Sequence, residues 1–222
     1  MCERIDQSEH LGFYLRSIGW ADATVESQAE ASGNIRPREH RPVLHVQDGQ
    51  RCASDVIWSY RPAWAAAAPK PGKKQISIAI NVNAEKVEGV YWKRLLRAGR
   101  GIVCASGWFE WTWFEGSKEA WLIHRRDRDP LFIRALANFG EFKASPEEAG
   151  FVLVTADSLG GIVDTHDRRP VAADVDHARR WMDPELPAAD AAYLARTAIL
   201  GAEIFEWLPV DARRNRSTDP AE

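Results

Sequence analysis

The sequence predicts a single strand-rich domain of the α+β class, and three observations support this prediction. The 222 residues are 45% hydrophobic, which suffices for one ordinary core. Short apolar runs bounded by Gly, Pro and Asp outnumber the stretches with helical spacing. No internal repeat or linker-like change of composition divides the chain. We therefore expect one domain over residues 1–210, followed by a polar, flexible tail over residues 211–222.

The first half of the chain predicts one helix and three strands. Apolar residues at helical spacing indicate a helix over residues 11–18, capped by Ser8 and ended by Gly19. The polar stretch 21–33 is expected to be a loop, and Asp48-Gly49 a turn. A long surface excursion is expected over residues 61–74. The strands are expected at residues 42–46, 56–60 and 76–83.

The second half predicts three helices among further strands. One helix is expected over residues 84–98, with basic side chains that either form a solvated face or meet phosphate. Asp174 can cap a helix that runs to residue 181, and Pro187 can open one that runs to residue 200. The remaining strands are expected at residues 102–113, 120–124, 131–137, 151–155 and 204–210.

Composition excludes several classes of protein. The formal net charge is only −3, so any contact with nucleic acid requires a local basic patch. The three cysteines are widely spaced and form no CxxC pair, which argues against a disulfide framework or a cysteine zinc site and predicts a reducing, cytoplasmic location. We find no signal peptide and no apolar run long enough to span a membrane. No metal-ligand spacing or phosphate-binding glycine loop is present, so we expect no cofactor and no metal.

The start of the chain carries the most distinctive chemistry. If Met1 is removed, Cys2 presents an α-amine and a thiol on one residue. The amine can condense with an aldehyde to an imine, and the thiol can then close a five-membered thiazolidine. The same residue can also act as a nucleophile whose own amine serves as base. A small second residue left by chance is the alternative interpretation of this dipeptide.

Three other sites could take part in such chemistry. Glu110 lies in the aromatic stretch 107–111, where it either faces solvent by strand alternation or sits among rings that raise its pKa. His166 lies in a loop among an acid and two arginines, where it can shuttle protons or be incidental. Asn81 and Asn83 end an apolar strand, and their amides can orient a substrate or cap the following helix.

Taken together, these residues resemble a known family. Their order and approximate spacing are similar to those of the SRAP domain, the SOS response-associated peptidase family. The resemblance runs from Cys2 to about residue 210 and rests on Cys2 with Arg4, Asn34, Pro37, Trp58, residues 62–64, 81–85 and 107–111, Thr155, and residues 166–170.

The resemblance implies a strand-rich domain of largely antiparallel sheets with a few flanking helices. It also implies a monomeric protein that recognises abasic sites in single-stranded DNA and traps the sugar aldehyde on Cys2 as a thiazolidine. In this interpretation Glu110 assists proton transfer on the sugar, His166 is its partner, and Asn81 orients Cys2. The residues expected to contact DNA are Arg4, Asn34, Pro37, Trp58, Asn83, Thr155 and Arg168.

Two positions depart from the family pattern. Glu3 replaces a glycine and adds a negative charge beside the expected DNA-facing terminus, and Asn83 replaces an arginine that would meet the DNA backbone. Two alternative functions therefore stay open. One is a cysteine peptidase that acts on its own amino terminus, and the other is a non-covalent binder of single strands.

Overall fold

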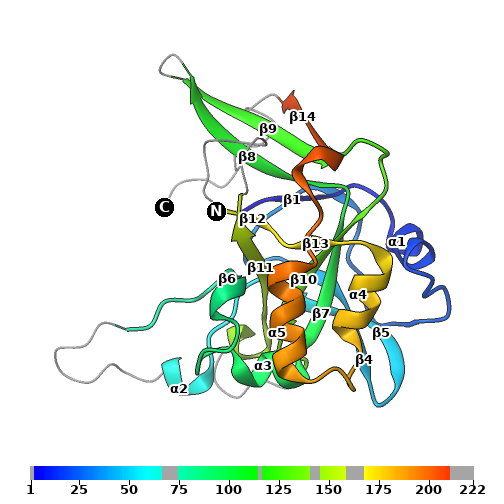
Figure 1. The fold of residues 1–222 in the computed structure, drawn as a ribbon, viewed down its shortest axis with the longest axis vertical. Coiled ribbons are helices and arrows are strands. Elements are labelled where there is room, and N and C mark those ends of the chain that lie inside the picture. Colours follow the sequence, from blue (N-terminus) through cyan, green and yellow to red (C-terminus); the bar gives the residue numbers. More distant parts are fainter. Residues whose placement is uncertain (1–2, 67–74, 115–116, 141–145, 159–167, 211–222) are drawn as a thin grey trace.

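The computed structural model describes residues 3–66, 75–114, 117–140, 146–158 and 168–210, and it confirms the strand-rich α+β class (Figure 1). The strands are β1 Ile5–Gln7, β2 Thr24–Val25, β3 Ser32–Ile35, β4 His40–Gln47, β5 Gln50–Ile57, β6 Asn81–Asn83, β7 Arg100–Ala105, β8 Gly107–Phe114, β9 Ser117–Arg125, β10 Leu131–Ala137, β11 Phe151–Asp157, β12 Arg168–Pro170, β13 Ala172–Ala173 and β14 Phe205–Val210. The α-helices are α1 Leu11–Ser17, α2 Ala63–Ala66, α3 Lys93–Ala98, α4 Val175–Met182 and α5 Ala188–Thr197. Short 3-10 turns are η1 Ala84–Lys86, η2 Pro146–Ala149 and η3 Ala202–Ile204.

The strands form two sheets among the described residues. A five-stranded sheet has the order β14-β9-β8-β1-β3. A nine-stranded sheet has the order β12-β11-β10-β7-β4-β5-β2, with β13 paired to β10 and β6 paired to β11. The pairs β6–β11 and β2–β5 are parallel, and the other strand pairs are antiparallel. The sheets are therefore largely antiparallel, as the resemblance implies.

The two sheets and the helices form three layers. Side chains of both sheets, including Ile5, Trp108 and Ile133, share one apolar cluster, which lies where the sheets pack together. A second cluster joins the other face of the large sheet to helices such as α4, through Phe132 and Trp181. Figure 1 shows α4 and α5 lying over the strands of the large sheet. Because both faces of β7 and β10 are covered, every residue of these two strands is buried.

Several local predictions are confirmed. Asp174 caps α4, because its side chain accepts a hydrogen bond of 2.8 Å from the His177 amide. Pro187 lies at the N-cap of α5. Asp48 and Gly49 both have positive φ, at 50° and 77°, and they form the turn that joins β4 to β5. Paired positive φ values of this kind match the twist of a two-residue hairpin.

The expected helix over residues 84–98 is wrong in its middle. The chain forms η1, then turns at Gly89, whose amide donates to the Lys86 carbonyl, and only then enters α3. Tyr91 and Trp92 lie in the interruption, and both rings pack against Tyr60 at centroid distances of 5.9 and 6.0 Å. Aromatic packing therefore overrides the helical spacing of the apolar residues.

The expected strand over residues 102–113 is in fact two strands of different sheets. β7 belongs to the large sheet and β8 to the small one, and the chain crosses between them at Ser106 and Gly107. Gly107 is needed there because a side chain would meet the Ile123 carbonyl on β9. Both strands contribute apolar side chains to buried clusters, so the sequence remains apolar across the crossing and does not reveal it.

Smaller differences concern short elements. The expected loop at 21–33 contains β2 and the start of β3, and the expected strand at 76–83 reduces to β6 after an isolated bridge between Ala79 and Tyr60. Ser8 does not cap α1, whose N-cap is His10. Residues 67–74 of the expected surface excursion and the expected tail 211–222 lie outside the described residues.

Candidate functional site

The first strand places the start of the chain beside Glu110. Ile5 on β1 pairs with Trp108 on β8, and the Phe109 amide donates to the Arg4 carbonyl at 3.0 Å. The same antiparallel register sets Glu3 opposite Glu110, on the same face of the small sheet. Cys2 is the covalent neighbour of Glu3, although Cys2 itself lies outside the described residues. The carboxyl of Glu110 is thus a near neighbour of the amino-terminal segment.

Glu110 is enclosed, so the solvent-facing interpretation of this residue is wrong. Its side chain is 3% exposed, and its opposite residue on β9 is Trp121. Burial raises the pKa of Glu110 to about 7, and the like charge of Glu3 acts in the same direction. A carboxyl with this pKa exchanges its proton readily near neutral pH, which suits a general acid or base.

Arg4 and Asn34 form a polar pair on the neighbouring strands. The Arg4 guanidinium donates to the Asn34 side-chain oxygen at 2.7 Å, and it also lies over the Trp111 ring at 5.9 Å. Burial lowers the pKa of Arg4, and the nearby charge of Arg36 lowers it further. The two guanidiniums and the Trp111 indole together provide groups that can recognise phosphate and a base.

Pro37 lies in a turn that Trp58 holds in place. The Trp58 carbonyl accepts from the Arg38 amide at 3.0 Å, and the Trp58 amide donates to the Glu39 carbonyl at 2.9 Å. Its indole donates to the Ile80 carbonyl at 2.9 Å, and its side chain is fully buried. The expectation that Trp58 contacts a DNA base is corrected, because it has no surface to offer a base. It instead fixes the Pro37 turn relative to the residue before Asn81.

Asn81 and Asn83 lie on β6, which runs parallel to β11. Asn81 pairs with Leu153 and Asn83 pairs with Thr155, and both asparagines are partly buried. The interpretation of Asn83 as a helix cap is wrong, since it occupies the N-cap of η1 without a side-chain cap hydrogen bond. Because strand side chains alternate, the two asparagines share one face while Val82 points to the core.

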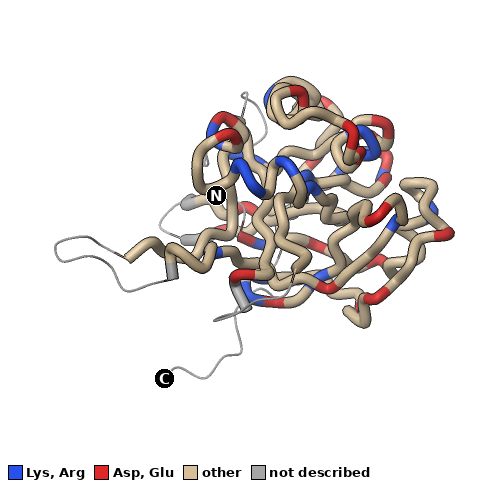
Figure 2. The backbone as a smooth tube through the Cα atoms, turned by 90° about the horizontal axis from the view of Figure 1, so that it is seen from below, with Lys and Arg blue, Asp and Glu red and all other residues tan. Residues whose placement is uncertain are grey.

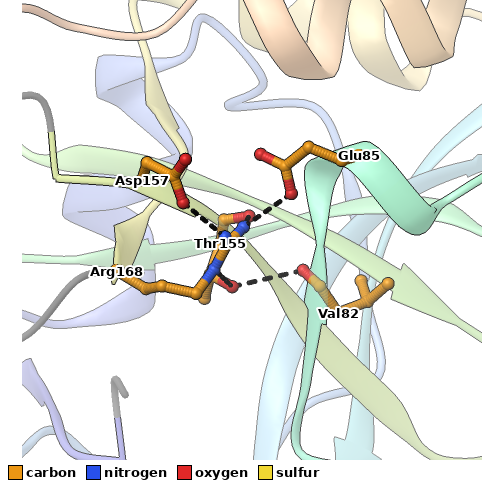
Figure 3. A network of polar contacts seen from close by, with 5 residues as sticks. All are labelled: Val82, Glu85, Thr155, Asp157 and Arg168. Carbon is orange, nitrogen blue, oxygen red and sulfur yellow. Dashed lines mark hydrogen bonds and ion pairs between the residues drawn. The ribbon is translucent and has the colours of Figure 1, made fainter.

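Arg168 and Thr155 belong to one polar network (Figure 3). Arg168 donates to Asp157 at 2.6 Å, to Glu85 at 2.9 Å and to the Thr155 carbonyl at 2.8 Å. The Thr155 hydroxyl donates to the Val82 carbonyl at 3.4 Å and is itself fully buried. Thr155 therefore offers DNA no surface, which corrects its expected role, and it acts instead by holding Arg168. Two carboxylates compete with any phosphate for this guanidinium.

The residue after Arg168 connects this network to the small sheet. The Arg169 guanidinium lies over the Phe205 ring at 6.0 Å, and Phe205 packs edge-on against Trp108 at 5.1 Å. Trp108 precedes Glu110 by two residues and therefore lies on the same face of β8. A continuous row of contacts thus runs from β12 through β14 to the strand that carries Glu110.

Some residues of the site could not be found from the sequence, and two expected ones are not described. Cys2 and His166 lie outside the described residues. Arg36 and Trp111 stand within stretches that the resemblance covers, but their contacts with Arg4 depend on how β1, β3 and β8 align. No sequence signal identifies Glu85 as a partner of Arg168, because the two are 83 residues apart.

Three findings concern the described chain as a whole. Among the described residues, no group of three or more His, Cys, Asp or Glu side chains could hold a metal ion, and no helix is long and apolar enough to cross a membrane. Basic and acidic positions are interspersed along the described chain (Figure 2). Any attraction for a phosphate backbone must therefore come from a local group such as Arg4 with Arg36.

Comparisons with known proteins place these features in context. The model of a family described as SOS response associated peptidase (SRAP) matches residues 1–217. The abasic site processing protein YedK of Escherichia coli is 31% identical over 214 residues, covering 95% of this chain and 92% of that protein. The abasic site processing protein HMCES of Gallus gallus is 27% identical, over 78% of this chain and 60% of that protein. The crystal structure of a phage-related protein from Bordetella bronchiseptica has 32% identity and a TM-score of 0.78, over 94% of each chain.

Proposed function

Because the chain belongs to the SOS response-associated peptidase family, we propose that it forms a covalent crosslink with abasic sites in single-stranded DNA. Two relatives are named for abasic site processing, one of them at 31% identity over almost the whole chain. The substrate class of the proposal follows from these relatives. The mechanism rests on the residues of this chain.

The observation that carries the proposal is the enclosed Glu110 beside the amino-terminal segment. An abasic sugar must open to its aldehyde before it can react, and ring opening requires a proton to be moved between sugar oxygens. The buried Glu110 carboxyl, with a pKa of about 7, can give or take that proton at neutral pH. The β1–β8 register brings the start of the chain to the same place.

The covalent step uses both groups of Cys2 once Met1 has been removed. The α-amine attacks the aldehyde carbon, and loss of one water molecule gives an imine. The thiol then adds to the imine carbon, and its proton passes to the imine nitrogen. The resulting thiazolidine differs from the reactants by one water. Both His166, by resemblance, and Glu110 are suited to move the protons of these steps.

Binding of the strand in this proposal falls to the residues around Arg4. Its guanidinium, held by Asn34 and flanked by Arg36, provides local positive charge in a chain whose net charge is −3. Trp111, beneath Arg4, is half-buried and offers part of a ring to a base. Asn34, Pro37, Asn83 and Arg168 complete the proposed DNA-facing set, with Arg168 restrained by its two carboxylates.

The test uses processed protein and a single-stranded oligonucleotide with one abasic site. We expect a denaturation-resistant adduct from the wild type, none from Cys2→Ala, and slow formation from Glu110→Gln. Cys104→Ala is the matched control, because Cys104 is buried and should leave the reaction unchanged. Absence of an adduct from the wild type at neutral pH and low salt would refute the proposal.

A second candidate is cysteine peptidase activity on the chain's own Met1. It is favoured by the description of the family as a peptidase and by the position of Cys2 directly after Met1. In this case the Cys2 thiol attacks the Met1 carbonyl, Glu110 supplies the proton to the Cys2 amine that departs, and water hydrolyses the resulting thioester to release Met1. Release of Met1 by purified protein, but not by its Glu110→Ala variant, would support it. A third outcome would indicate a non-covalent binder: the wild type forms no adduct, and Cys2→Ser binds single strands as tightly as the wild type does.

A further inference from the structure

Glu3 stands where its charge acts directly on Glu110. The pairing of Ile5 with Trp108 and the bond from the Phe109 amide to the Arg4 carbonyl fix the register of the amino-terminal segment. In that register Glu3 lies across from Glu110, and side chains of directly opposite residues share one face of an antiparallel pair. Repulsion between the Glu3 carboxylate and an ionised Glu110 is unfavourable. Glu3 is exposed, so the packing of the core does not require a glutamate at this position.

Two charges act on Glu110: the positive charge of the amino terminus lowers its pKa, and the carboxylate of Glu3 raises it. The neighbours of Glu110 on the adjoining strands are uncharged. On β9 the opposite residue is Trp121, and on β14 the residue paired with Trp121 is Pro209. Along β8 the residues on the same face are Trp108 and Thr112, both uncharged. Among the described residues that face Glu110 from the amino-terminal segment, β9 and β14, Glu3 is therefore the charged one.

We propose that Glu3 is a positioning residue that controls the protonation of Glu110 and thereby sets the pH range over which the crosslink forms. The effect on the pH range of crosslinking rests on the proposed function, whereas the effect on the protonation of Glu110 does not. An ionised Glu3 opposes a second negative charge at Glu110, so Glu110 keeps its proton to higher pH. Glu3 is exposed, so salt weakens the effect without abolishing it.

The effect of Glu3 on Glu110 matters for the reaction of the α-amine that is freed at Cys2. This amine lies one residue before Glu3 in the chain, and it must be neutral to attack an aldehyde. A protonated Glu110 is ready to act as an acid in the same pH range in which that amine begins to lose its proton. The carboxylate of Glu3 keeps Glu110 protonated further into that range.

The first test measures Glu110 itself, in protein with carbon-13-labelled glutamate. We expect its carboxyl carbon to titrate at lower pH in Glu3→Gln than in the wild type, by on the order of a few tenths of a pH unit at low salt. High salt should narrow the difference. Glu9→Gln is the matched control, because Glu9 is exposed and removes the same charge six residues further on. An unchanged midpoint in Glu3→Gln, or an equal shift in Glu9→Gln, would overturn the inference.

The second test follows the rate of crosslink formation against pH. Whichever protonation state of Glu110 is active, the limb of the profile that reports Glu110 should move to lower pH in Glu3→Gln and stay in place in Glu9→Gln. A profile that does not move, despite a moved titration, would overturn the link to the reaction. Absence of any adduct from the wild type would refute the proposed function, while the titration would still decide whether Glu3 controls Glu110.

Discussion

Replacing Glu110 by glutamine should stabilise the protein at alkaline pH. Burial raises the pKa of this carboxyl from 4.5 to about 7. Between these two values the folded chain binds the Glu110 proton more tightly than the unfolded chain does, so its stability falls as pH rises through this window. Glutamine occupies nearly the same volume and has no proton to lose.

The size of the effect follows from the two pKa values. Each pH unit between them changes the free energy of unfolding by about 1.4 kcal/mol, so full ionisation of the buried carboxyl costs roughly 3 kcal/mol. The advantage of Glu110→Gln over the wild type should therefore be small at pH 4 and approach that value by pH 8. The same residue is thus unfavourable for stability and favourable for proton transfer.

Urea unfolding of both proteins at a series of pH values measures this difference directly. All other titrating groups are common to the two proteins, so subtracting the two curves isolates Glu110. Glu119→Gln, which removes a half-buried glutamate from β9, controls for the loss of one carboxylate in the same hairpin. A difference between Glu110→Gln and the wild type that stays constant from pH 4 to 8 would refute the reasoning.

Two further substitutions test the assignment of residues to core and to DNA contact. Trp58→Ala should lower the free energy of unfolding, measured in urea, by about 3–5 kcal/mol, because the indole is fully buried. Trp64→Ala is the control and should lower it by under about 1 kcal/mol, because Trp64 is 57% exposed. Similar losses in the two variants would contradict the core assignment of Trp58. Asn83→Arg should tighten binding of an undamaged single strand and steepen the dependence of log affinity on log salt by about 0.7, with Asn83→Gln unchanged. An unchanged slope in Asn83→Arg would place residue 83 away from the phosphates.

The sequence predicted elements well where one local signal decides the structure. The Asp174 cap and the Asp48-Gly49 turn are confirmed because side-chain capping and positive φ depend on a few adjacent residues. The chain crossing at Ser106 and the break around Gly89 were missed. Both depend on tertiary packing, of β7 and β8 in different sheets and of Tyr91 with Trp92 on Tyr60.

For the candidate site, the sequence identified residues better than their roles. Glu110 was named, but alternation alone left it facing solvent, because a single strand does not reveal that both its faces are covered. Trp58 and Thr155 were named as DNA contacts, yet both are fully buried and act by holding Pro37 and Arg168. The partners of Arg168 come from β11 and η1, and only the folded chain brings them together.

Mass measurement of the crosslinked amino-terminal peptide shows whether the α-amine and the thiol of Cys2 both join the abasic sugar. We predict a peptide that lacks Met1 and carries the sugar remnant with the loss of one water, resistant to borohydride because the imine has closed to a thiazolidine. Cys2→Ser, which keeps the amine, should give a stable adduct only when borohydride is present. A crosslinked wild-type peptide that retains Met1, or a sugar attached anywhere other than Cys2, would exclude the thiazolidine mechanism.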